Sequence, residues 1–247
     1  MAYPTYVSYK SDYDSSSTTT HTITWPSGVT NGNLLYGVFA TRDYGENWSS
    51  GGVTKTDNIT YIQYEGYDVG GYHIRMFVFF GLAATTNTLV LTSPMSVIGR
   101  WIVYEFSDHN LPYPTASGFF GLAGEIFWEN SGTHFDCPIC PTPAYYGSHD
   151  YTWLTFVCYN SSSTFTCPTD FSNQINNIRT STEFEVSIAA ARRNYATEQL
   201  DPGNWDTGIA SAMDYGSYTV RIPPGIYPED TPSGFGFIVP SSNVDLP

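Results

Sequence analysis

The chain has 247 residues, and its 23 acidic and 9 basic side chains give a formal net charge of −14. This excess of acid, without a cluster of Lys and Arg, argues against partners such as nucleic acid or anionic membranes. Aromatic residues make up 17% and charged residues only 13%, the opposite of a disordered composition. With 22 Gly and 16 Pro, which favour turns, the composition predicts an all-β protein.

Apolar and alternating runs predict the strands of the first half. They are expected at residues 6–9, 20–25, 34–41, 60–65, 72–82, 88–91 and 100–106. A polar loop over residues 43–58 carries Trp48 near its centre. Gly118, Gly121 and Gly124 interrupt residues 108–136, so this segment is predicted to be a linker.

The second half repeats the pattern of the first. Its strands are expected at residues 151–158, 163–167, 182–194, 204–211 and 216–222. Three landmarks recur in the same order: 34–40 with 151–158, 74–80 with 186–192, and 101–106 with 218–222. The period of about 115 residues suits a duplicated domain better than a solenoid. Residues 188–196 have good helix propensity, but their place in the repeat predicts a strand.

The fold prediction is therefore two tandem antiparallel β-sandwiches, jelly-roll-like, followed by an extended arm. The predicted parts are a first sandwich at 1–107, a linker at 108–136, a second sandwich at 137–224 and an arm at 225–247. The residues expected to be buried are Leu35, Val38, Ile74, Phe77, Val103, Leu154, Phe156, Val186, Ile188 and Val220.

The last 23 residues have no counterpart in the first half. They contain four prolines, which favour an extended backbone, and an apolar cluster made of Phe235, Phe237, Ile238 and Val239. An exposed cluster of this kind would be a liability, so we expect it to be buried. It could fold back on its own domain or reach a neighbour. The expectation is a neighbour in a symmetric homo-oligomer, a homotrimer, which makes this segment an assembly arm.

Residues that could carry chemistry are sparse. The four cysteines, at 137, 140, 158 and 167, lack the two close pairs of a zinc ribbon. A metal or a disulfide is the alternative to the reduced thiols that we expect. The five histidines are scattered, and no nucleophile elbow, phosphate loop or dinucleotide fingerprint occurs. The sequence therefore predicts no catalytic residues, no metal site, no cofactor and no enzyme activity.

Aromatic residues near loops offer one possible binding site. Trp48 and Tyr67 could stack on sugar rings, and they are the candidate glycan contacts. The alternative is that these aromatic residues fill a core or a subunit interface. No targeting segment or membrane-spanning run is recognised, so synthesis and folding in a cytoplasm are expected.

Residues 22–35 resemble the opening "T-x-x-x-P-x-G-x-x-x-G-D-L-L" of a tandem β-sandwich family common among structural proteins of tailed bacteriophages. Asn33 stands where the family usually has Asp. The second half resembles the same family through an apolar strand beginning near Asp150, an Ala-Ala-Arg-Arg strand at 190–193, residues 198–205 and the closing strand 218–224. The cysteines and the arm are not part of the pattern.

This resemblance implies a non-enzymatic bacteriophage virion protein with no catalytic residues to transfer. The leading hypothesis is a capsid cement or decoration protein that clamps shell subunits. It would be made in the host cytoplasm and located in the virion. Its partners would be other virion proteins, either the major capsid protein or tail proteins. The alternative is a tail fibre or tail-tip module that binds host surface glycans.

Overall fold

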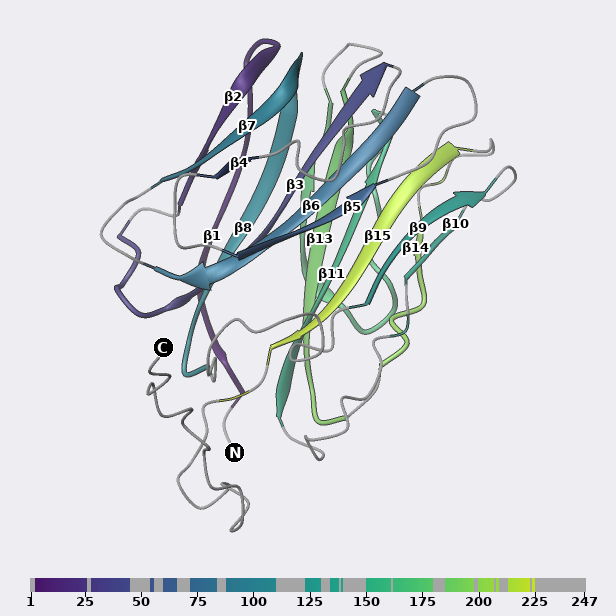
Figure 1. Ribbon diagram of the computed structural model, residues 1–247. Coiled ribbons are helices and arrows are strands. Elements are labelled where there is room, and N and C mark those ends of the chain that lie inside the picture. Colours follow the sequence, from purple (N-terminus) through teal and green to yellow (C-terminus); the bar gives the residue numbers. More distant parts are fainter. Residues whose placement is uncertain are drawn as a thin grey trace, which may run out of the picture.

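The computed structural model describes residues 3–25, 28–44, 54–55, 60–65, 72–83, 88–109, 123–129, 134–137, 139, 150–160, 162–179, 185–197, 200–206, 208, 213–222 and 224. Within these residues the protein is all β, without helices, and its strands pair in antiparallel sheets (Figure 1). The predicted fold class is therefore confirmed. The arm at 225–247 lies outside the described residues.

Strands of the first half form a large and a small sheet. The first large sheet has the order β1 (Thr5–Tyr13), β8 (Gly99–Ser107), β3 (Leu34–Tyr44), β6 (Tyr72–Leu82) and β5 (Thr60–Glu65). The first small sheet has the order β2 (Thr18–Thr24), β7 (Thr88–Val97) and β4 (Thr54–Lys55). We call these two sheets together the first module.

Strands of the second half form a matching pair of sheets, the second module. The second large sheet has the order β12 (Ser172–Asn177), β13 (Ser187–Tyr195), β11 (Tyr151–Tyr159), β15 (Met213–Ile222) and β9 (Ala123–Glu129). The second small sheet pairs β10 (His134–Asp136) with β14 (Asn204–Asp206).

The two modules share one strand order. Read from the opposite edge, the second large sheet runs β9-β15-β11-β13-β12, which matches β1-β8-β3-β6-β5 of the first. The three sequence landmarks lie on β3 and β11, β6 and β13, and β8 and β15, the same places in the two sheets. Thr166 bridges to Asp206 on β14, just as β4 pairs with β7, so the small sheets also correspond. The topology therefore supports the duplication that the sequence pattern indicated.

The four sheets stack as four layers, with the two large sheets in the middle (Figure 1). The first small sheet covers the outer face of the first large sheet through a core that includes Ile23, Phe39 and Phe79. The second small sheet covers the outer face of the second large sheet through Phe135, Trp153 and Trp205. Side chains alternate between the two faces of each strand, so each large sheet contributes to two cores.

The two modules meet through the inner faces of the large sheets. Their shared core, which we call the central core, includes Leu34, Val78 and Ile102 from the first module and Leu154 and Ile188 from the second. Across it, β1 contacts β12 and β5 contacts β9, while β8 contacts β13 and β6 contacts β15. The counterparts of β1 and β12 are β9 and β5, so the first two contacts are equivalent. The counterparts of β8 and β13 are β15 and β6, so the last two contacts are equivalent as well. The modules are therefore arranged like the two halves of a twofold-symmetric dimer.

All ten side chains that the sequence predicted to be buried are at most 3% exposed, which confirms those predictions. Residues 187–195 form β13, so the strand prediction there is confirmed over the helix alternative. The structure differs at the predicted linker 108–136, where residues 123–129 and 134–136 form β9 and β10. The glycines predict breaks in regular structure, but Gly124 pairs opposite Tyr218 at the edge of a sheet.

The structure also contains an edge strand, β12, that the sequence did not predict. It is largely polar and exposed, and only Ile175 and Asn177 are buried. Such a strand lacks the apolar alternation on which sequence prediction depends.

Candidate functional site

None of the site residues proposed from the sequence falls in the described part of the chain. The apolar cluster of the assembly arm (Phe235, Phe237, Ile238 and Val239) and the candidate glycan contacts Trp48 and Tyr67 all lie outside it. The structure instead brings together three groups of polar or aromatic side chains that the sequence did not connect. The first is an Asp–His–Ser cluster, and the second is a group of hydrogen-bond donors around the Glu105 carboxylate. The third is the contact region between the two modules, which we call the seam.

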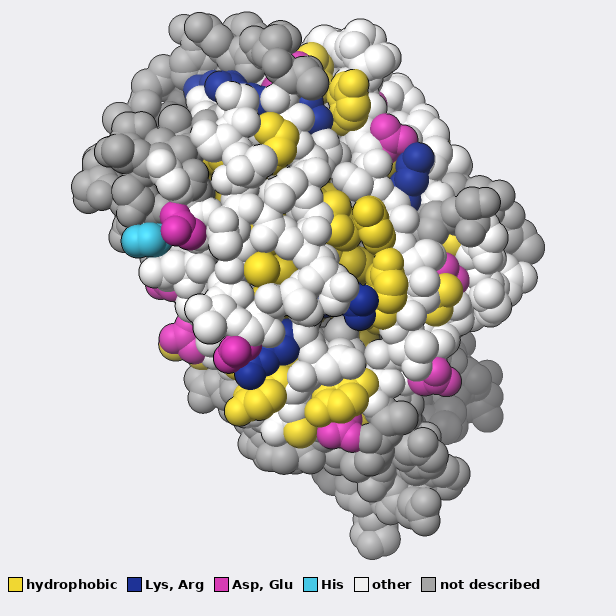
Figure 2. All heavy atoms as spheres, turned by 180° about the vertical axis from the view of Figure 1, so that it is seen from behind, with side chains coloured by type: hydrophobic (Ala, Val, Ile, Leu, Met, Phe, Trp, Pro, Cys, Tyr) yellow, Lys and Arg dark blue, Asp and Glu magenta, His cyan; other side chains and the backbone are white. Residues whose placement is uncertain are grey.

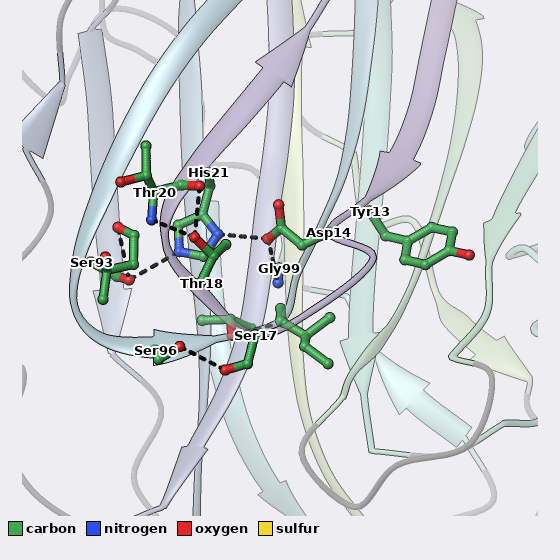
Figure 3. Close-up of polar contacts among 12 residues, drawn as sticks. Tyr13, Asp14, Ser17, Thr18, Thr20, His21, Ser93, Ser96 and Gly99 are labelled. Carbon is green, nitrogen blue, oxygen red and sulfur yellow. Dashed lines mark hydrogen bonds and ion pairs between the residues drawn. The ribbon is translucent and has the colours of Figure 1, made fainter.

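The side chain of His21 contacts Asp14 on one side and Ser93 on the other, the same order as in the catalytic triad of a serine hydrolase (Figure 3). Asp14 lies in the turn between β1 and β2, His21 lies on β2, and Ser93 lies on β7. His21 Nδ1 is 2.6 Å from Asp14 Oδ2, and His21 Nε2 is 3.0 Å from Ser93 Oγ. Pattern alone would therefore suggest a nucleophile, its base and an orienting acid.

The Ser93 hydroxyl is already bound to an acceptor other than His21. Ser93 Oγ lies closest to the carbonyl oxygen of Met95, at 2.7 Å, and we assign its single proton to that bond. Ser93 Oγ also lies 3.0 Å from His21 Nε2, and His21 Nδ1 lies 2.6 Å from the Asp14 carboxylate. A serine whose proton is held by a backbone carbonyl is not poised to pass that proton to a histidine.

The cluster is also closed to any substrate. His21 is fully buried, with the Phe39 ring 4.8 Å from its own, and Ser93 is 4% exposed. Asp14 Oδ2 accepts a second bond from the Gly99 N–H at 2.9 Å, and the Asp14 N–H donates to the Gly99 carbonyl. These contacts tie the β1–β2 turn to β7 and to the start of β8. We therefore interpret the cluster as a structural clasp.

Glu105 forms the second polar cluster, beside the turn that precedes β3. Its carboxylate accepts hydrogen bonds from Ser8 Oγ at 2.7 Å, the Thr30 N–H at 3.0 Å and Asn33 Nδ2 at 2.7 Å. Burial by itself would raise the pKa of Glu105, but these three donors outweigh it and hold the pKa below its ordinary value. Gly28 and Gly32 have φ of +79° and +87°, which explains both glycines of the motif.

The cluster also accounts for Asn33, the residue at which the chain departs from the sequence pattern that it resembles. Asn33 donates its side-chain amide to Glu105, whereas an Asp at this position would present a second carboxylate. The Asn33 amide therefore suits this position, because it donates to Glu105 without adding a second negative charge.

The seam between the modules holds a buried ionic network. Arg100 of β8 donates to Glu185 Oε2 at 2.5 Å and to Asn177 Oδ1 at 2.7 Å, and both acceptors belong to the second module. Asn177 in turn donates to the carbonyl oxygen of Asp12 on β1 at 2.7 Å. Arg100 is 1% exposed and Glu185 is 5% exposed, so the two opposite charges compensate each other where water is excluded.

Strand β1 follows this seam and carries an exposed aromatic row on one side. Tyr6, Tyr9 and Tyr13 pair opposite Phe106, Tyr104 and Arg100, residues whose side chains point towards the second module. Tyr9 and Tyr13 are nevertheless 48% and 44% exposed. Only the spacing of the tyrosines in the sequence hinted at such a row, and the bulge between Tyr6 and Ser8 obscures it.

The described cysteines are reduced and buried to different degrees. Cys137 packs between the sheets of the second module, with its Sγ 3.1 Å from Thr155 Oγ1, whereas Cys158 faces the central core. Burial raises the pKa of both thiols to about 12. Within the described residues, no group of three His, Cys, Asp or Glu side chains could hold a metal ion.

Comparison with known proteins adds no relative. No family model matches the chain, and no match was found among curated proteins or solved structures. In the part of the chain that the structure describes, no helix is long and apolar enough to cross a membrane.

Proposed function

We propose that this protein is a non-enzymatic structural component of a bacteriophage virion, a decoration protein that clamps subunits of the capsid shell. The observation that carries the proposal is the joining of two like β-sandwiches through one continuous apolar core. The resemblance of residues 22–35 to a phage structural family supplies the biological setting.

The fixed arrangement of the modules suits a clamp. Because the modules share a buried core and a buried ion pair, they cannot reorient independently. Two like surfaces at a fixed separation can engage two neighbouring subunits, and the second contact then forms at a high effective concentration. A protein that binds only the assembled shell shifts the equilibrium towards assembly.

The Asp14–His21–Ser93 cluster lends no support to a hydrolase, because it is buried and its serine proton is already bound. Binding and assembly are therefore the functions that the described geometry favours.

Purified virions provide the test. We expect the protein at a fixed copy number per particle by quantitative mass spectrometry, and on the shell by labelling electron microscopy. Particles lacking it should release their genome at a lower temperature, and added protein should restore the wild-type value. Absence from virions would end the proposal, whereas a label confined to the tail would favour the tail-fibre alternative.

A further inference from the structure

The tyrosine row on β1 differs from the rest of the described surface. Figure 2 shows hydrophobic side chains gathered in a band on the face opposite to that of Figure 1. Among the large side chains exposed in the described residues, Val7, Tyr9 and Tyr13 belong to the single strand β1. The row therefore combines rigid aromatic rings with a fixed spacing along one strand.

A cation without an acidic partner lies beside this row. The guanidinium of Arg192, on β13, stacks 3.8 Å from the Tyr6 ring centroid. Arg192 makes no ion pair with any described residue, and its Nε is buried without a hydrogen-bond partner there. In a chain of net charge −14, an arginine left in this state marks a place where an anionic group would be stabilised.

Aromatic rows of this kind recognise extended proline-rich segments, because prolines pack flat against the rings of a preformed surface. The chain itself contains such a segment. Pro228 and Pro232 flank Glu229 and Asp230, and Phe235 and Phe237 follow. The two prolines can pack on the tyrosine rings, and the two acidic side chains carry the charge that complements Arg192.

The segment also starts in the right place. The last described residue, Pro224, forms a bridge with His109, which follows the end of β8. Ser107 at that end of β8 pairs with Thr5, the first residue of β1. Thr152, opposite Ile222 of β15, has its Oγ1 3.3 Å from the Pro4 carbonyl oxygen. The C-terminal segment therefore leaves the fold beside the start of the tyrosine row.

Its length matches the length of the row. Nine residues of β1 span about 30 Å at roughly 3.3 Å per residue. Ten residues, 228–237, span about 31 Å in an extended proline-rich conformation. A short connection of three residues keeps the effective concentration of the segment in the millimolar range, which favours its own chain over the neighbouring subunit expected from the sequence.

We propose that residues 228–237 bind across the tyrosine row of the same chain. In this arrangement Pro228 and Pro232 pack on the tyrosine rings, and the acidic pair Glu229 and Asp230 neutralises Arg192. The segment covers an exposed apolar strip and fixes the path of the remaining residues. The proposal concerns the isolated protein and does not depend on a role in the virion.

Nitration of tyrosines, located by peptide mass spectrometry, tests the docking in solution. We compare the full chain with a variant carrying Pro228→Ser, Pro232→Ser, Glu229→Gln and Asp230→Asn. The matched control carries Ser241→Ala and Ser242→Ala. Tyr9 and Tyr13 should react about tenfold faster in the first variant and unchanged in the control, since a millimolar effective concentration makes docking favourable. Tyr195, which points to the opposite face of the second large sheet, is the internal reference.

A second variant, Arg192→Gln, should release the segment to a smaller extent, because it removes the charge contact and leaves the tyrosines in place. Equal reactivity of Tyr9 and Tyr13 in the full chain and in the first variant would overturn the proposal. Protection that appears only as the protein concentration rises would also overturn it, because the occupant would then be a second copy. Loss of virion binding with tyrosine protection retained would reject the proposed function alone.

Discussion

The first and second modules share a strand order but fill their outer cores with different chemistry. On the second strand of the first module, the buried inward residue opposite Leu91 is His21, which binds Asp14 and Ser93. On the second strand of the second module, the corresponding residue is Phe135, opposite Trp205. Its ring stacks 4.3 Å from that of Tyr215. A polar hydrogen-bonded clasp and an aromatic stack thus occupy corresponding places.

This difference shows which part of the sequence specifies the fold. The apolar runs of the large sheets are similar in the two modules, and they create the central core. The small sheets only have to cover the outer faces, so either polar or aromatic side chains suffice, provided that every buried polar atom has a partner. The two modules therefore share one topology, although the side chains that fill their outer cores differ in chemistry.

The contact that holds the modules together should be the most sensitive to change. Glu185→Ala leaves Arg100 buried without its carboxylate, and we expect the free energy of unfolding to fall by about 3–5 kcal/mol. Urea unfolding, followed by tryptophan fluorescence, measures the change.

The matched control removes both charges. Arg100→Met combined with Glu185→Leu should be much less destabilising than Glu185→Ala alone, because no charge is left unpaired. If the double variant proves to be the less stable one, the interpretation of the seam as a dependent pair is wrong.

The second prediction compares the corresponding residues directly. Phe135→Ala should reduce the free energy of unfolding by about 3–5 kcal/mol through the cavity it leaves. His21→Ala should reduce it by a similar or smaller amount, about 2–4 kcal/mol, because a smaller cavity is joined by the lost bonds to Asp14 and Ser93. Adding Asp14→Asn to His21→Ala should recover part of the loss, whereas Asp14→Asn with Phe135→Ala should simply add. Additivity in both cases would show that Asp14 and His21 do not interact.

The third prediction concerns Asn33, which donates to the Glu105 carboxylate. Asn33→Asp places a second carboxylate against Glu105 and removes a donor, so stability at neutral pH should fall by about 1–3 kcal/mol. The deficit should shrink on acidification, as one of the two carboxylates binds a proton. Asn33→Ser, which adds no charge, serves as the control. A larger deficit in Asn33→Ser than in Asn33→Asp would contradict the electrostatic explanation.

The smallest expected effect is the pH dependence that Glu105 itself contributes. Its folded pKa lies below the ordinary value of 4.5, so its ionised form stabilises the fold above that pH. The contribution is lost as the pH falls through the folded pKa. Unfolding free energies of the wild type and of Glu105→Gln should therefore converge between pH 6 and the acid range, about pH 3. A constant difference over that range would show that Glu105 does not titrate differently in the two states.

The sequence predicted the inner strands of the large sheets well but missed two of their four edge strands, β9 and β12, for a physical reason. Largely apolar strands such as β3 and β11 are recognisable because residues on both faces of each are buried. The edge strands β9 and β12 contain glycine or polar residues and depend on a neighbour for their conformation, which a local pattern does not reveal.

The contacts of the clusters were even less accessible to prediction. Asp14 and Ser93 are brought together by the pairing of β2 with β7, and Arg100 meets Glu185 only because the two modules pack together. Sequence separations of 72 residues between His21 and Ser93 and 85 residues between Arg100 and Glu185 leave no local signal. In contrast, the spacing of Gly28 and Gly32 before β3 was visible, because a left-handed backbone requires glycine whatever lies nearby.

The central core has a consequence for the order of events during synthesis. Its first-module half, including Leu34, Tyr36 and Val78, leaves the ribosome long before its partners Phe156 and Tyr218 exist. Because translation adds about 5–20 residues per second, the apolar inner face of the first large sheet stays uncovered for on the order of ten seconds, until the second module has been synthesised. During that interval a nascent chain resembles a dimer subunit without its partner, and it is open to chaperones or to the wrong neighbour. Placing both halves on one polypeptide ensures that the correct cover always arrives next.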